Sequence, residues 1–269
     1  MNHKKALISL EKIIPNKLLN QIQYLHCSLV SWWILHLGSQ PLKFSEKSAM
    51  VFSPHQDDET FGCGGMIASK REQGIPVNIT FLTDGRGSHG SDPHIQNQVI
   101  HIRQQESLMA LDILGVNTSD IHFLNHQDGS LSSLNVEKKQ QIITQISELL
   151  QLYQPGEVYV PHRKDCHQDH EATYNLVKEA ISQYKITTEL LQYPIWVFWR
   201  SPLFILLKLQ DIAAAYRLSV TSVKDKKARA IAAYASQLQI LPDGFINRFL
   251  NSQEIFFKSD SEGTGKTHV

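Results

Sequence analysis

The sequence has no formal net charge and few cysteines, and both features limit the classes of protein to which it can belong. Its 26 Lys and Arg residues balance its 26 Asp and Glu residues, so the formal net charge is zero. This balance gives no general attraction to nucleic-acid phosphates, and we expect no nucleic-acid partner. The three cysteines, Cys27, Cys63 and Cys166, include no Cys-x-x-Cys pair. They argue against a disulfide framework and favour a reducing, cytoplasmic compartment.

Charge is also missing from one stretch near the amino terminus. Residues 18–42 contain no Asp, Glu, Lys or Arg, although Asn, Gln, Ser and His interrupt the apolar residues. Three interpretations stay open: a helix packed on the domain, which we favour, a helix lying at a membrane surface, and a membrane span. No small-residue cleavage site follows the first apolar residues, so we do not expect a standard secretory signal.

The remainder of the chain alternates short apolar runs with helical patterns. We expect strands at 48–53, 77–82, 121–124, 158–160 and 187–193, and helices at 62–73, 95–114, 136–153 and 170–184. Such alternation predicts a single α/β domain with a Rossmann-like, mostly parallel sheet and helices on both faces. The dinucleotide fingerprint Gly-x-Gly-x-x-Gly is absent. We assign residues 1–46 to a helical extension, 47–258 to the α/β domain and 259–269 to a flexible tail.

A histidine and three acids follow the first predicted strand. His55, Asp57, Asp58 and Glu59 lie within five positions, directly before a glycine-rich helical pattern. Unpaired charge at the end of a buried strand is costly, and a divalent metal is a common partner for it. His55 and Asp58 supply a nitrogen and an oxygen, and Asp57 lies close enough to reach a metal-bound water.

A second cluster follows the fourth predicted strand, at residues 165–171. His167 and His170 are three positions apart and share a face of a helical first turn. Ligands of open parallel sheets bind beyond the carboxyl ends of strands, where the strand order reverses. The two clusters can therefore meet, and a second imidazole completes the ligand count of a catalytic zinc site. Cys166 offers an alternative thiolate ligand, although we favour an inert thiol there.

These two clusters resemble the motifs of a known family. Pro54-His55-Gln56-Asp57-Asp58-Glu59 resembles the Pro-His-Pro-Asp-Asp-Glu signature of the PIG-L/LmbE-like de-N-acetylases. His167-Gln168-Asp169-His170 resembles the His-Pro-Asp-His motif of that family. Gln56 and Gln168 replace the prolines of both motifs, at positions that are not ligands in the family. Weaker similarities lie at 83–86, 103–106 and 128–131 and in a late Lys…Ser-Gln motif that starts at Lys227, so the resemblance covers about residues 47–240.

The resemblance implies a reaction and a metal. The reaction is hydrolysis of the acetamide of an N-acetylated sugar, of the N-acetylglucosamine type, free or lipid-linked. The implied ligands are His55, Asp58 and His170. The implied metal is Zn²⁺, with Fe²⁺ or Co²⁺ as alternatives, because nitrogen and oxygen ligands discriminate weakly between these ions.

The other polar residues of the motifs have expected roles as well. Asp57, beside a ligand but not itself one, is expected to act as the general base. His167 as an imidazolium is expected to stabilise the oxyanion or to act as an acid, and Asp169 to orient His167 or a ligand histidine. Arg103 and Asp128 are candidates for binding sugar hydroxyls or a phosphate, or they are an ordinary helix and turn residue.

Three rival functions stay open. An amidase acting on a sugar-thiol conjugate would use the same residues. A two-metal phosphoesterase would need further bridging carboxylates, and a non-catalytic sugar-binding protein would need neither Asp57 nor His167. The aromatic stretch 193–209 either belongs to the core or contacts a hydrophobic substrate. With Trp32 and Trp33 it also leaves open peripheral contact with a membrane.

Overall fold

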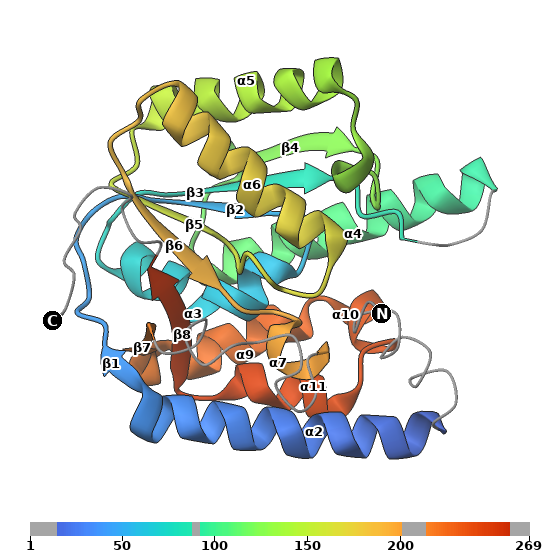
Figure 1. Cartoon of the computed structure of the whole chain (residues 1–269), viewed down its shortest axis with the longest axis vertical. Helices are drawn as coiled ribbons and strands as arrows, with labels where there is room; N and C mark the ends of the chain where they lie inside the picture. The colour runs from blue at the N-terminus through green and yellow to red at the C-terminus, as the bar shows by residue number, and fades with distance from the viewer. Residues whose placement is uncertain (1–14, 88–91, 201–213, 259–269) are drawn as a thin grey trace, which may run out of the picture.

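The computed structural model describes residues 15–87, 92–200 and 214–258, arranged around one eight-stranded sheet (Figure 1). The strands are β1 (Ser39–Pro41), β2 (Ala49–Ser53), β3 (Val77–Thr83), β4 (Ile121–His126), β5 (Glu157–Pro161), β6 (Glu189–Tyr193), β7 (Ala215–Ser219) and β8 (Gln253–Lys258). Their order is β1-β7-β8-β6-β5-β2-β3-β4, and β8 is antiparallel to both of its neighbours while the other pairs are parallel. The predicted α/β class with a mostly parallel sheet is confirmed.

Helices cover both faces of this sheet (Figure 1). On one face lie α5 (Val136–Tyr153) and α6 (Gln168–Gln183), and on the other lie α3 (Asp58–Glu72), α4 (Pro93–Leu114) and α9 (Lys224–Ala232). The other α-helices are α2 (Asn16–Trp33), α7 (Val197–Arg200), α10 (Ala235–Leu238) and α11 (Asp243–Asn247). Single turns are η1 (Ile34–Gly38), η2 (Thr118–Asp120), η3 (Leu131–Ser133), η5 (Thr221–Val223) and η6 (Arg248–Leu250).

The apolar run of β2 is explained by burial on both faces. Met50 and Phe52 pack in the cluster beneath α5 and α6, whereas Ala49 and Val51 pack in the cluster beneath α3. All four side chains have no exposed surface. For this reason the sequence of a central parallel strand is a continuous apolar run rather than an alternation of apolar and polar residues.

Strand order reverses between β2 and β5. From β2 the chain continues to β3 and β4 on one side, and then returns to β5 on the other side of β2. The carboxyl ends of β2 and β5, which precede the two polar clusters, are therefore adjacent at a topological switch point. This confirms the predicted meeting place.

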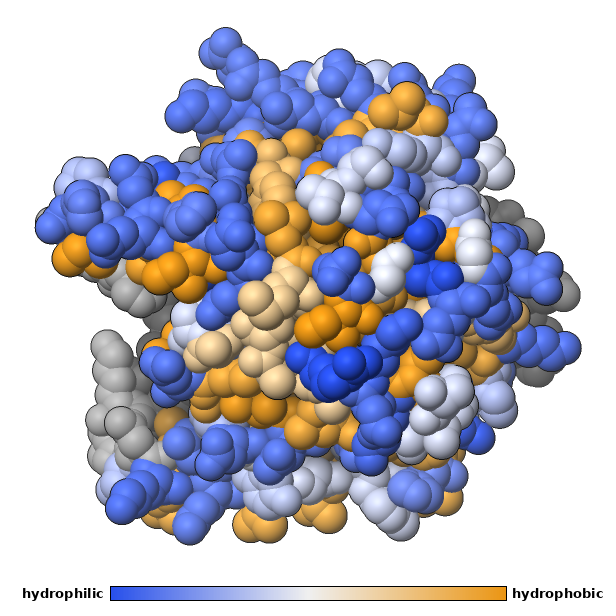
Figure 2. Space-filling model, turned by 180° about the vertical axis from the view of Figure 1, so that it is seen from behind, coloured by the Kyte–Doolittle hydropathy of each residue, from blue (hydrophilic) through white to orange (hydrophobic). Residues whose placement is uncertain are grey.

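The amino-terminal segment packs on the sheet domain, the first of the three interpretations. Helix α2 contacts α7 and α11, and β1 pairs with β7. The outward side of α2 exposes Leu25, Leu29 and Trp32. In Figure 2 the lower edge, where α2 runs, is mainly hydrophilic with separate hydrophobic spots. Within the described residues, no helix combines the length and apolar character needed to cross a membrane.

The aromatic stretch after β6 belongs to the core and to the site. Phe198 and Trp199 are 1% and 3% exposed, and Trp196 is half-buried. Residues 201–209 of that stretch, and the tail 259–269, lie outside the described residues. The sequence reasoning did not predict β1, β7 or β8, which extend the sheet beyond β6.

Candidate metal centre and active site

His55 and Asp58 come from the turn that joins β2 to α3. Asp58 is the first residue of α3, and its Oδ2 lies 3.1 Å from Nδ1 of His55. Glu59 accepts the backbone N–H of Asp57 at 3.1 Å, so it supports the start of the helix. Both His55 and Asp58 are buried, with 8% and 3% of their surfaces exposed.

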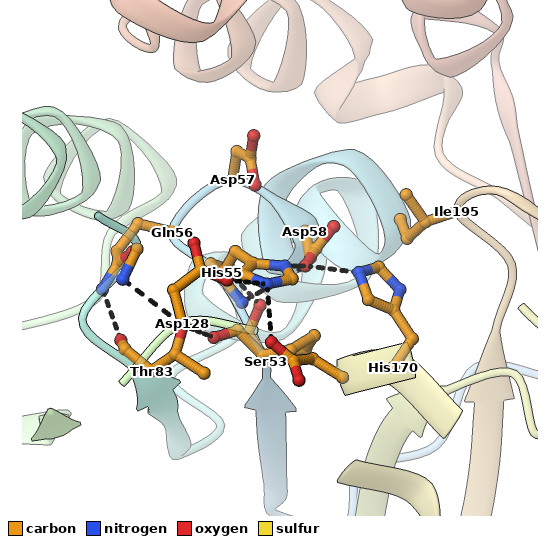
Figure 3. Close-up of polar contacts among 12 residues, drawn as sticks. Ser53, His55, Gln56, Asp57, Asp58, Thr83, Asp128, His170 and Ile195 are labelled. Carbon is orange, nitrogen blue, oxygen red and sulfur yellow. Dashed lines mark hydrogen bonds and ion pairs between the residues drawn. The ribbon is translucent and has the colours of Figure 1, made fainter. Parts of the chain in front are cut away.

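His170 reaches the same carboxylate oxygen from the other cluster. It lies in the first turns of α6, and its Nε2 is 3.2 Å from Oδ2 of Asp58. This nitrogen is buried and forms no hydrogen bond with any described residue, because the contact with Asp58 lacks hydrogen-bond geometry. Figure 3 shows Asp58 between His55 and His170, with Asp57 pointing away from them. Three ligand atoms thus converge from segments more than 100 positions apart.

The remaining nitrogen of each histidine faces a carboxylate. Nε2 of His55 lies 3.1 Å from Oδ1 of Asp128 and 3.4 Å from Oδ2 of Asp169. Nδ1 of His170 lies 2.7 Å from Oδ2 of Asp165, which is fully buried. Metal-binding histidines almost always have such a partner on the second nitrogen, since it fixes the tautomer and the ring orientation.

This donor set fits a divalent cation. Zinc bonds to nitrogen and oxygen are about 2.0–2.2 Å long, which places tetrahedral ligand atoms roughly 3.3–3.6 Å apart, close to the separations around Asp58. Burial alone would lower the histidine pKa values. The surrounding carboxylates outweigh it, raising the pKa of His55 well above its usual value and that of His170 to about 9. The site therefore stabilises positive charge at this point.

Two further ligand groupings occur in the same cluster. Nitrogens of His55, His167 and His170 lie within 4.8 Å of one another, as do ligand atoms of His55, Asp128 and Asp169. The second grouping shares His55 with the first, and its carboxylates already accept backbone N–H groups of Gly87, Gly129 and Leu131. It therefore does not provide an independent second metal site.

Asp57 lies on the cavity side of the cluster in a strained conformation. Its φ of 144° is in a region that non-glycine residues rarely adopt, and such strain persists where surrounding structure holds it. Burial raises the pKa of Asp57 to about 7, with a contribution from neighbouring Asp58, and Arg103 offsets part of that rise. The guanidinium Nη2 of Arg103 is 3.3 Å from Oδ1 of Asp57. A carboxyl group with this pKa can exchange a proton near neutral pH.

His167 lies beside His55 and His170 and shares the first of these groupings with them. Its ring centroid is 4.9 Å from that of His55 and 4.7 Å from that of His170. Burial lowers the pKa of His167 to about 3, together with the charges of those two histidines. The structure therefore favours a neutral His167 that donates one N–H, rather than the imidazolium expected from the sequence.

Three other expected site residues serve as supports in the structure. Arg103 donates to the backbone carbonyls of Gly85 and Gln56 at 3.1 and 2.8 Å, besides its contact with Asp57. Asp128 and Asp169 both face His55, and no hydrogen bond joins Asp169 to His167 among the described contacts. Of the two partners expected for Asp169, His55 is the one within 3.4 Å of its carboxylate.

Gln56, which stands where the family has proline, joins the ends of β2 and β3. Its Nε2 donates to the carbonyl of Thr83 at 2.9 Å, and the side chain is fully buried. A Cβ added at Gly85 would lie 2.0 Å from Oε1 of Gln56. The φ of +66° favours glycine here, and an added Cβ would also force the buried Gln56 amide to shift.

We expect Gly85→Ala to destabilise the protein more than Gly74→Ala. Gly74 has a similar φ of +71° but open space around the added Cβ, so its replacement adds only backbone strain of about 1–2 kcal/mol. At Gly85 the clash adds to that strain. Urea unfolding of both variants measures the difference, and equal losses of unfolding free energy would contradict the role of Gln56.

A cavity of about 620 Å³ opens over this cluster. Its polar lining comprises His55, Asp57, Asp58, Arg103, Asp128, His167 and Gln237. Its apolar lining comprises Phe61, Ile195, Trp196, Ile240, Leu241 and Phe245, and the sequence reasoning marked only the stretch that holds Trp196. Asp165, which holds His170, also received no role from the sequence, although its position two residues before His167 was a signal.

Comparisons with known proteins agree with this site. The family described as PIG-L: GlcNAc-PI de-N-acetylase matches residues 50–181. A probable N-acetyl-alpha-D-glucosaminyl L-malate deacetylase 2 of Bacillus cereus is 27% identical over 144 residues, which are 51% of this chain and 62% of that relative. The chain thus covers less than two thirds of the length of that deacetylase.

Two other similarities extend further along the chain. A 4-oxalmesaconate hydratase of Pseudomonas putida is 26% identical over 207 residues, covering 71% of this chain and 74% of the hydratase. The structure of N,N'-diacetylchitobiose deacetylase from Pyrococcus horikoshii matches with a TM-score of 0.62 and 19% identity, covering 86% of this chain and 90% of that one. This structural likeness shows a shared fold. Residues 50–181, which carry the candidate metal centre, belong to the PIG-L/LmbE-like de-N-acetylase family.

Proposed function

We propose that the protein is a metal-dependent amide hydrolase that removes the acetyl group from an N-acetylated sugar of the N-acetylglucosamine type. One observation carries the proposal. Oδ2 of Asp58 lies 3.1 and 3.2 Å from nitrogens of His55 and His170, and Asp57 lies beside this trio on the cavity wall. Three metal ligands with an adjacent carboxyl base form the arrangement of a catalytic rather than a structural metal site.

The ion in this proposal is Zn²⁺, with Fe²⁺ or Co²⁺ as alternatives, held by His55, Asp58 and His170. When bound, it would lower the pKa of a water and polarise the amide carbonyl. Asp57 takes a proton from the attacking water and returns it to the leaving amine, which its pKa of about 7 permits. The neutral N–H of His167 donates to the developing oxyanion. Arg103 holds the Asp57 carboxylate in place.

The charge of the cavity favours a neutral substrate over a carboxylate one. Among the described residues that line it, Arg103 is the sole Lys or Arg, and it already contacts Asp57 and two backbone carbonyls. The names of the malate deacetylase and the hydratase specify carboxylate groups, and among the described lining residues no Lys or Arg side chain other than the engaged Arg103 can bind one. A sugar-thiol conjugate would be handled by the same residues and stays the second candidate.

The test is metal-dependent acetate release by purified protein from a panel of N-acetyl sugars. The panel should contain N-acetylglucosamine, N,N'-diacetylchitobiose, a sugar-thiol amide and an N-acetylglucosaminyl lipid in vesicles. We expect acetate from at least one N-acetyl sugar, abolished by chelation and restored by Zn²⁺, Co²⁺ or Fe²⁺. A preference for the vesicle substrate would support a lipid-linked sugar as the substrate and contact between α2 and the membrane. Sugar binding without acetate release, with metal bound, would reject the hydrolase in favour of a binding protein.

His170→Ala provides the matching test of the ligands. The variant should lose tight metal binding, because His170 supplies one of three converging atoms and its Asp165 partner cannot replace it. Metal content by atomic absorption, compared with that of the wild type, measures this loss. Unchanged content would refute the ligand assignment.

A further inference from the structure

One wall of the cavity is apolar and is held rigidly. Trp196 stacks on Phe245, with ring centroids 4.3 Å apart and ring planes at 21°. Phe245 is 1% exposed, so it provides a fixed base, whereas Trp196 is half-buried and lines the cavity. Stacked aromatic rings lose little conformational freedom when a ligand binds, which makes them effective binding surfaces.

Asp165 fixes the backbone that carries Trp196. Its carboxylate accepts the N–H groups of Ile195, Trp196 and Val197 at 2.9–3.1 Å. The same carboxylate lies 2.7 Å from Nδ1 of His170. The apolar wall and the metal ligand are therefore positioned by one buried group, and Figure 3 shows Ile195 next to His170.

Arg248 holds the wall from behind. Its guanidinium donates to the carbonyls of Pro194 and Ile195, and it lies 5.3 Å from the ring centroid of Phe245 and 4.0 Å from that of Phe249. The aromatic pair is thus braced by an acid on one side and a cation on the other. Neither Asp165 nor Arg248 is among the residues that line the cavity, so the wall presents Trp196 and Phe245 to it.

The edge of this wall leaves apolar surface exposed. Ile240 lines the cavity and is 67% exposed, next to partly buried Leu241. Exposed apolar surface at the rim of a polar catalytic pocket marks a place that a ligand covers. A bare N-acetyl sugar presents mainly hydroxyl groups and would leave much of this surface in contact with water.

We infer that the substrate carries a neutral, apolar aglycone next to its N-acetyl sugar, and that Trp196, Phe245, Ile240 and Leu241 bind it. This inference rests on the proposed function and names the substrate class for the same site. The sugar acetamide faces the His/Asp cluster, and the alkyl or aryl group lies along the aromatic pair and the rim.

The test compares methyl and octyl glycosides of N-acetylglucosamine, below the concentration at which the octyl compound forms micelles. We expect the metal-loaded wild type to have a kcat/KM about tenfold or more higher for the octyl glycoside, since each buried methylene contributes to discrimination. Trp196→Ala and Ile240→Ser should lower this octyl-to-methyl ratio several-fold. Leu152→Ser, a matched change of an apolar residue 70% exposed on α5 and outside the cavity lining, should leave the ratio unchanged.

The outcomes separate this inference from the proposed function. If the octyl-to-methyl ratio of kcat/KM is near one while acetate release is measurable, the apolar subsite is wrong and the proposed deacetylase activity stands. A higher kcat/KM for a malate-bearing glycoside than for the octyl glycoside would lead to the same conclusion.

If no glycoside releases acetate, the proposed function fails. Calorimetric binding of the octyl glycoside then still tests whether the apolar wall binds the alkyl group. Binding at least several-fold tighter than that of the methyl glycoside, and weakened in Ile240→Ser, supports the wall, whereas equal binding rejects it.

Discussion

Replacing Asp57 with Asn is expected to lower kcat by about 10²–10⁴-fold, the usual contribution of a positioned general base. Asparagine has nearly the same shape, so the surrounding contacts that hold the strained φ of 144° should be retained. The change removes the group that accepts a proton while leaving His55, Asp58 and His170 in place. Metal content should therefore equal that of the wild type.

The measurement is steady-state deacetylation of the best substrate, with metal content determined on the same samples. Asp112→Asn is a suitable control, because Asp112 is an exposed carboxylate on α4 outside the cavity lining. Its activity should match the wild type. Wild-type turnover in Asp57→Asn would remove Asp57 as the base. Loss of metal together with activity would instead make Asp57 part of the metal site.

The proximity of His55, Asp58 and His170 could be predicted from the sequence because it follows from the positions of strand ends. His55 and Asp58 follow β2, His170 follows β5, and these strands are neighbours at the switch point. Backbone topology alone brings such residues together. The resemblance in the same two motifs named the family and the reaction, and the comparisons agree with both.

The supporting residues could not be predicted in this way, because their roles depend on which direction each side chain takes. Asp128 and Arg103 were either substrate-binding candidates or an ordinary turn and helix residue, and the structure adds contacts that neither interpretation specified: Asp128 with His55, and Arg103 with backbone carbonyls. The cavity wall was missed for a related reason. Phe245 lies in α11, between β7 and β8 in the chain, so its contact with Trp196 depends on how these two strands extend the sheet. Those strands lack a strong sequence pattern.

Lys227, the lysine of the late Lys…Ser-Gln motif, has a structural position rather than a place in the cavity. Its Nζ donates to Oε1 of Glu254 at 2.6 Å, and both side chains are nearly fully buried. The Glu254 carboxylate also accepts the backbone N–H groups of Gly65 and Met66, at 2.6 and 2.9 Å. This pair therefore connects α9 and β8 to α3, the helix whose start carries Asp57 and Asp58.

Lys227→Met should destabilise the protein by about 3–5 kcal/mol, because it leaves the charge of Glu254 buried without its cation. The double variant Lys227→Met/Glu254→Gln should recover part of this loss, since a neutral amide oxygen can still accept from Gly65 and Met66. Lys226→Met is the matched control: Lys226 pairs with Glu72 at the surface, where such a pair contributes less than about 1 kcal/mol. Urea unfolding of all three variants measures these differences. A Lys227→Met loss as small as that of Lys226→Met would mean that the buried pair does not hold α3 in place.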